Sequence, residues 1–171
     1  MVYLLFPIPK IRDGLETILQ WDFIDNVFSS GALGSPLNRM IREDSQLAYS
    51  PEFISTTHAD GGYAGLVAQT SVDPERVLDA FWQLIESDLL RSSDWLEYVR
   101  DTIRGCIEMH DPDAGEYTET GSASLIHYGR CLSDKEYAAA MLGYSDDEVR
   151  DSLTRLDPSQ AHAIVFQGRG E

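Results

Sequence analysis

Hydrophobic and polar residues recur along this chain with strand or helix spacing in segments that cover most of its length. The short apolar run Val2–Ile8 contains aromatic residues, is bounded by prolines and predicts a buried strand. Residues 12–29 carry apolar side chains at helical spacing and predict a helix, which ends at a glycine-containing loop over residues 31–34. The chain is therefore expected to begin with a strand followed by a helix.

The next segment predicts a short helix and two paired strands. Ser35 stands before a proline, the pattern of an N-cap with proline in the first helical position, so a helix is expected to begin there and to end between residues 43 and 45. Residues 47–57 and 63–70 read as strands, joined by a turn that contains Asp-Gly-Gly. These two strands are expected to form a hairpin.

Two amphipathic helices follow the hairpin. Asp73 and Pro74 repeat the cap-then-proline pattern and open the first of them, and the second begins near Ser93. The apolar face of the first is expected to contain Val77, Leu78, Phe81, Leu84, Ile85 and Leu89. The apolar stripe of the second is expected to contain Trp95, Val99, Ile103, Cys106 and Ile107.

The last part of the chain predicts three shorter helices and a closing strand. Residues 122–130 are expected to be helical, and the Ser-x-x-Glu patterns at 133–136 and 145–148 are capping boxes that open two further helices. Residues 161–167 predict the closing strand. The whole pattern predicts an α+β fold, with residues 1–171 forming one domain in which helices pack against a sheet.

Charge narrows the range of partners. The chain has 29 acidic and 13 basic residues and a net charge of −16, which repels nucleic acid and anionic membranes. Such a surface favours basic peptides or basic partners, or serves solubility in a saline environment. No apolar run is long enough to cross a bilayer and the start lacks signal-peptide features, so we expect a soluble cytoplasmic or periplasmic protein.

Residues that often carry chemistry are scattered. Two cysteines, Cys106 and Cys131, make no disulfide framework and are expected to be buried, reduced thiols. The histidines are too far apart in sequence to form a zinc motif, and we expect no metal and no catalytic residue in this chain. They are His58, His110, His127 and His162.

An acidic segment could bind a hard cation, but its spacing matches no EF-hand loop, so a solvated loop is the preferred interpretation. It contains Glu108, His110, Asp111, Asp113 and Glu116.

Several segments, in order, resemble the second domain of the pitrilysin/insulinase family of zinc metallopeptidases, to which the mitochondrial processing peptidase belongs. They are the small-residue step at 34–37, the Ile-Arg-Glu sequence at 41–43, Leu-Ala-Tyr-Ser at 47–50, the stretch at 125–130 and the final helix and strand. The family often has glycine where this chain has Gln46, and two adjacent glycines where it has Gly31-Ala-Leu-Gly34. The resemblance implies a two-layer domain, with a largely antiparallel sheet and helices on one face.

The resemblance also implies a role. In the family, residues matching Arg42 and Tyr49 reach the substrate from the non-catalytic domain, while zinc lies in the catalytic one. We therefore expect a non-catalytic, substrate-binding and partner-docking domain, whose partners are a peptide and a zinc-bearing domain or subunit, in a homo- or heterodimer. From the residues alone, Arg42 could instead pair with Glu43 or Asp44 at the surface while Tyr49 belongs to the core. A proteolytically inactive structural subunit and a self-associating binding module are the alternatives for the chain.

Overall fold

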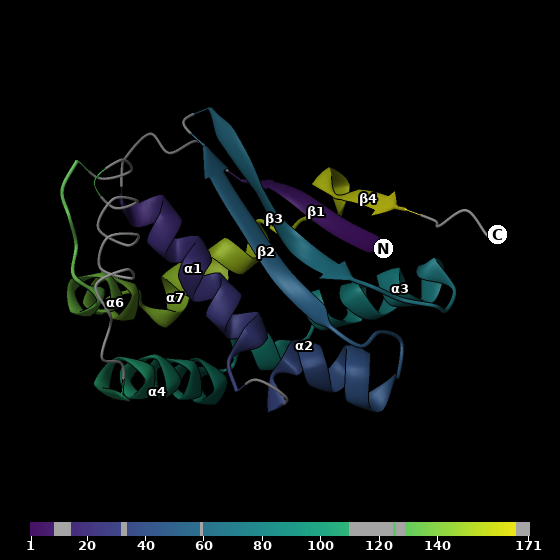
Figure 1. Cartoon of the computed structure of the whole chain (residues 1–171), viewed down its shortest axis with the longest axis horizontal. Helices are drawn as coiled ribbons and strands as arrows, with labels where there is room; N and C mark the ends of the chain where they lie inside the picture. Colours follow the sequence, from purple (N-terminus) through teal and green to yellow (C-terminus); the bar gives the residue numbers. More distant parts are fainter. Residues whose placement is uncertain (9–14, 32–33, 59, 110–124, 126–128, 167–171) are drawn as a thin grey trace.

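The protein contains a four-stranded antiparallel sheet with the strand order β2-β3-β1-β4 (Figure 1). Its strands are β1 (Val2–Ile8), β2 (Pro51–His58), β3 (Gly61–Ala68) and β4 (His162–Val165). The computed structural model describes residues 1–8, 15–31, 34–58, 60–109, 125 and 129–166. All four predicted strands are present, although the second begins at Pro51 rather than at residue 47.

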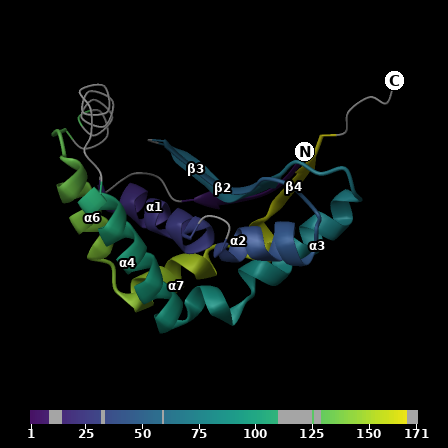
Figure 2. The same cartoon turned by 60° about the horizontal axis from the view of Figure 1, so that its bottom comes forward.

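Side chains alternate strictly along β1, the inner strand that pairs with both β3 and β4. Val2, Leu4, Phe6 and Ile8 are buried, whereas the residues between them are half-buried or exposed. This alternation is expected when only one face of a sheet is covered. Figure 2 shows the described helices together on one side of the sheet, which confirms the predicted α+β fold with helices on one face.

The helices begin where the sequence provides caps. The hydroxyl groups of Ser133 and Ser145 each accept a hydrogen bond from the backbone three residues later, and both predicted capping boxes are complete. Ser35 and Asp73 are N-caps followed by proline, as predicted. The helices are α1 (Leu15–Ser29), α2 (Pro36–Asn38) with a π-helical continuation (Arg39–Asp44), α3 (Pro74–Ile85), α4 (Ser93–Met109), α6 (Asp134–Leu142) and α7 (Asp146–Thr154), with 3₁₀ turns at Asp88–Arg91 and Pro158–Gln160.

Aromatic side chains fill much of the space between the sheet and the helices. Phe28 of α1 stacks on Phe53 of β2 with ring centroids 4.7 Å apart, and Phe6 of β1 meets Trp82 of α3 edge to face at 5.7 Å. Trp21 is also buried. None of the helices in the described part of the chain is long and apolar enough to span a membrane.

A buried arginine joins α4 to the start of α7. Arg100 donates to the carbonyl of Tyr144 at 3.0 Å and to Oδ1 of Asp146 at 2.7 Å. Its guanidinium lies 5.6 Å from the centroid of the Phe23 ring on α1. The hydrogen bond from Ser93, together with those from Arg100 and the nearby positive charge, lowers the pKa of Asp146. The buried cation is therefore paired with a carboxylate and a carbonyl, as burial of a charge requires.

Three predictions about individual side chains are wrong. Cys106 and Cys131 are exposed rather than buried. Leu89 was expected on the apolar face of α3, but α3 ends at Ile85 and Leu89 lies exposed in the following 3₁₀ turn, where Leu90 is buried instead. Helical spacing shows which residues share one face of a helix. It does not show where the helix ends or which part of that face is covered by other elements. The predicted helix at 122–130 falls mostly outside the described residues.

A carboxylate between α1 and α6 provides a test of the helix packing. Asp22 of α1 is half-buried and accepts a hydrogen bond from the hydroxyl of Tyr137 on α6. Burial raises the pKa of Asp22; the Tyr137 hydrogen bond opposes this shift, and the charge of Asp25 adds to it. A carboxyl group whose pKa is raised by folding destabilises the folded state increasingly as the pH rises above its unfolded-state pKa, and the full cost is reached above the raised pKa.

We expect Asp22→Asn to increase the free energy of unfolding at pH 7, because an uncharged amide replaces a desolvated carboxylate. The gain should shrink towards zero as the pH falls below the ordinary aspartate value of 3.8, where both folded and unfolded wild-type chains are protonated. Urea unfolding of wild type and variant at pH 7 and at a pH below 3.8 measures the difference in the free energy of unfolding. Asp79→Asn, at an exposed position of α3, is the control. An Asp22→Asn gain independent of pH would contradict this account.

Candidate functional site

The candidate site begins at the π-helical turn that continues α2. Ile41 in this turn is completely buried and anchors it against the core. Arg42, the next residue, is consequently directed to the edge of the domain, where its side chain is 31% exposed. A π-helical turn is uncommon and is often found at functional positions in proteins.

The chain leaves this turn through a left-handed residue. Gln46 has φ of 50°, and among the described non-glycine residues it alone has a positive φ. The N–H of Leu47 then donates to the carbonyl of Ile41 at 2.9 Å, which closes the helix end. This is the position where the resembling family often has glycine, and the structure supplies the physical reason: glycine adopts such a conformation without steric cost.

Residues 47–50 form an irregular connection to β2, with a bend at Tyr49, which corrects the prediction that Tyr49 lies on a strand. The connection is fixed from the other side of the hairpin, because the hydroxyl of Thr70 donates to the carbonyl of Leu47 at 2.6 Å. The same hydroxyl accepts from the N–H of Val72 at 3.0 Å. Leu47 is buried while Tyr49 is 75% exposed, so Tyr49 is not a core residue.

Arg42 and Tyr49 lie together. The guanidinium carbon of Arg42 is 4.7 Å from the centroid of the Tyr49 ring, which is a cation–π arrangement. Nε of Arg42 also lies 3.3 Å from a carboxylate oxygen of Glu43, so the surface ion pair considered from the sequence does form. In the described part of the chain the Tyr49 hydroxyl makes no hydrogen bond. Two donors, a guanidinium and a phenol, are thus presented next to each other.

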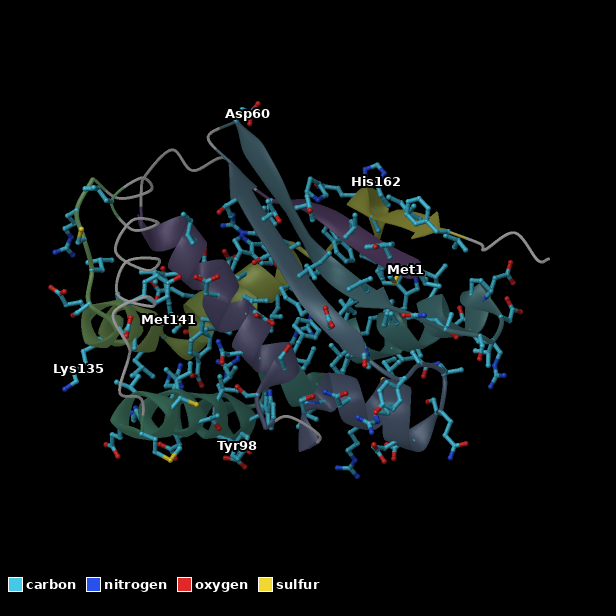
Figure 3. The ribbon with its side chains drawn as sticks, in the orientation of Figure 1. Met1, Asp60, Tyr98, Lys135, Met141 and His162 are labelled. Carbon is cyan, nitrogen blue, oxygen red and sulfur yellow. The ribbon has the colours of Figure 1, made fainter. Side chains whose placement is uncertain are left out.

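An open groove of about 720 Å³ surrounds the pair. It lies at the end of the β2–β3 hairpin away from its tip, which Asp60 marks in Figure 3. The residues that follow β3 were not predicted as part of the site. Pairing of the predicted hairpin could have indicated them, because it places them beside the residues that precede β2. The groove is lined by Arg42, Glu43, Gln46, Leu47, Ala48, Tyr49, Ser50, Gln69, Thr70 and Ser71.

The other candidate residues do not gather into a site within the described structure. No three His, Cys, Asp or Glu side chains in the described residues are grouped so that they could hold a metal ion. His162 is exposed on β4, and Glu108 is exposed near the end of α4. His110, His127, the side chain of His58 and the rest of the acidic segment (Asp111, Asp113 and Glu116) lie outside the described part.

Comparison with known proteins defines the fold. No protein-family model and no curated protein sequence matches this chain. Among solved structures, it is similar to a protease from Helicobacter pylori, with a TM-score of 0.77, 11% sequence identity and coverage of 95% of this chain and 40% of that one. It is similar to the peptidase M16 inactive domain from Pseudomonas fluorescens, with a TM-score of 0.71, 15% identity and coverage of 95% and 40%.

A third similar structure is the inactive peptidase domain of a protein assigned as a zinc protease from Bordetella parapertussis. Its TM-score is 0.70 and its identity 14%, over 97% of this chain and 91% of that domain. The chain thus has the fold of the inactive, non-catalytic domain of M16-like zinc peptidases, which confirms the predicted resemblance to the pitrilysin/insulinase family at the level of the fold. It spans 40% of the length of the Helicobacter pylori protease.

The left-handed residue at the groove gives a prediction. We expect Gln46→Gly to increase the free energy of unfolding by about 0.5–1 kcal/mol, because relief of left-handed strain outweighs the added flexibility of the unfolded chain. Gln46→Ala keeps the strain and should stay within about 0.5 kcal/mol of wild type. Urea unfolding measures both. A Gln46→Gly protein that is less stable than Gln46→Ala would contradict this interpretation of the turn.

Proposed function

We propose that this chain is a non-catalytic domain that binds the substrate and docks to the catalytic domain of a zinc-dependent metalloendopeptidase acting on peptides. The observation that carries the proposal is the pairing of Arg42 with Tyr49 in an open groove of a fold shared with inactive M16 peptidase domains. The zinc would be held by a catalytic domain or subunit outside this chain.

The chemistry of the pair suits a peptide carbonyl. Arginine presents several N–H donors in a rigid fork, and tyrosine presents one hydroxyl on a stiff ring. In the assembled peptidase, zinc would activate water and polarise the scissile carbonyl. The donors of this chain would hold the peptide backbone beside that carbonyl and help to stabilise the oxyanion that forms there.

The immediate surroundings keep Arg42 oriented but available. Its guanidinium rests on the Tyr49 ring and touches Glu43, so its direction is restricted before any ligand arrives. The Glu43 carboxylate is more than half exposed, and exposed ion pairs of this kind contribute little free energy. A ligand carbonyl can therefore accept from Arg42 without having to break a strong interaction.

A structural subunit with the same fold and no role in proteolysis is the second candidate. Its supporting observation is that the fold is shared with domains named as inactive. The two candidates differ in whether the groove residues affect turnover in the assembled protein. A structural subunit would tolerate changes at Arg42 and Tyr49 as long as assembly is preserved.

We expect Arg42→Ala to lower kcat/KM for peptide hydrolysis by about 100-fold in the assembly with the zinc-bearing partner, as loss of an oxyanion donor does. Tyr49→Phe, which removes only the hydroxyl, should act in the same direction with a smaller effect. Steady-state kinetics measures both, together with the zinc content of the assembly, which should not change.

Arg39→Ala is the matched control. Arg39 lies in the same π-helical turn and forms an exposed ion pair with Asp44, but it does not line the groove. Its removal should leave kcat/KM at the wild-type value. Wild-type turnover in both Arg42→Ala and Tyr49→Phe would refute the substrate-binding role and favour the structural subunit.

A further inference from the structure

The face of the sheet away from the helices carries an apolar strip. Cross-strand register places Val67 of β3 between Glu52 and Tyr3, and Tyr3 beside Ile164. The ring of Phe166 meets Tyr3 edge to face, with centroids 5.8 Å apart. Figure 2 shows that the described helices leave this face uncovered. Apart from Glu52 on the edge strand, apolar side chains thus lie across the sheet on its open side.

A hollow of about 310 Å³ lies on this face, next to the groove of the candidate site. We call it the sheet hollow. Ser50 and Gln69 line both the sheet hollow and the groove, so the two depressions adjoin. The sheet hollow is lined by Met1, Tyr3, Ser50, Glu52, Ile54, Val67, Ala68 and Gln69.

We propose that the sheet hollow is a specificity subsite that takes an apolar side chain of an extended peptide whose backbone is held at Arg42 and Tyr49. This inference rests on the proposed function and adds the class of peptide to it. The groove supplies a guanidinium and a phenol, which donate hydrogen bonds. The adjoining sheet hollow supplies the apolar side chains of Ile54 and Val67. A ligand that fills both depressions must carry hydrogen-bond acceptors, such as backbone carbonyls, and an apolar group a short distance apart.

The charges favour a peptide over an amphiphilic anion. Glu43 borders the groove and Glu52 borders the sheet hollow, and among the described residues Arg42 is the one cationic side chain that lines either depression. The α-ammonium of Met1, which also belongs to the lining of the sheet hollow, donates to the carbonyl of Phe166 at 2.9 Å. The whole protein carries a net charge of −16. This net negative charge would repel a fatty acid or an acidic peptide as it approaches, but not a neutral or basic peptide.

Ile54 is the most useful position to test. It lies on the edge strand β2, faces the open side and is half-buried, so its side chain can change without opening the core. Ile54→Thr keeps a β-branched side chain suited to a strand while it introduces a hydroxyl. Val165→Thr is the matched control. Val165 pairs with the buried Val2 and so belongs to the opposite face of the sheet.

The experiment measures binding of two fluorescein-labelled peptides to this chain by fluorescence anisotropy. Both are nine-residue Gly/Ser sequences with one Lys, and they differ only in a central Leu or Ser. We expect the Leu peptide to bind about five- to tenfold more tightly, as partial burial of a leucine side chain allows. Ile54→Thr should remove most of this preference and Val165→Thr should keep it, while Arg42→Ala should weaken both peptides equally.

Methyl NMR of the wild-type chain gives a readout that does not depend on any variant folding. The Leu peptide should shift the methyl signals of Ile54 and Val67 more than those of Val165. Equal affinity for the two peptides, with Arg42→Ala still weakening both, would overturn the apolar subsite and leave the proposed function intact. Binding of neither peptide would overturn both. Decanoate that displaces the Leu peptide and binds more tightly would overturn the assignment of a peptide ligand.

Discussion

One-sided burial of the sheet is the constraint on which the rest of this structure depends. Alternate residues of β1 enter the core from a strand that is paired on both sides, so the helices must gather on that face. The opposite face then remains available, and the connections at the end of the β2–β3 hairpin lie at its border. The core, the open face and the groove with Arg42 and Tyr49 thus follow from one alternating pattern.

The sequence predicts this architecture well where local signals are strong. Alternation along β1, the proline after Ser35 and the two capping boxes all act within a few residues, and each element begins where its signal lies. The predictions of burial are wrong where burial depends on residues that are distant in the sequence. Cys106 shares the apolar stripe of α4, yet it is exposed because a stripe is buried only where another element packs against it.

The candidate site could be predicted only in part. The sequence indicated Arg42 and Tyr49 through a resemblance, and the structure brings them into contact. Their environment depended on a backbone feature that propensities do not reveal, the left-handed Gln46, which ends the helix and keeps residues 47–50 out of the strand. The contribution of Thr70 could not be predicted locally, since its hydrogen bond joins Leu47, which precedes β2, to a residue that follows β3, and only the pairing of the two strands brings them together.

The most direct test of the central claim is the peptidase activity of this chain alone and in a mixture with its zinc-bearing partner, with the zinc content of each component measured in parallel. The account predicts no hydrolysis by the chain alone, no stoichiometric zinc in it, and hydrolysis that appears only in the mixture. Hydrolysis by the chain alone would contradict the account. So would an inert mixture in which the partner is demonstrably zinc-loaded and paired with this chain.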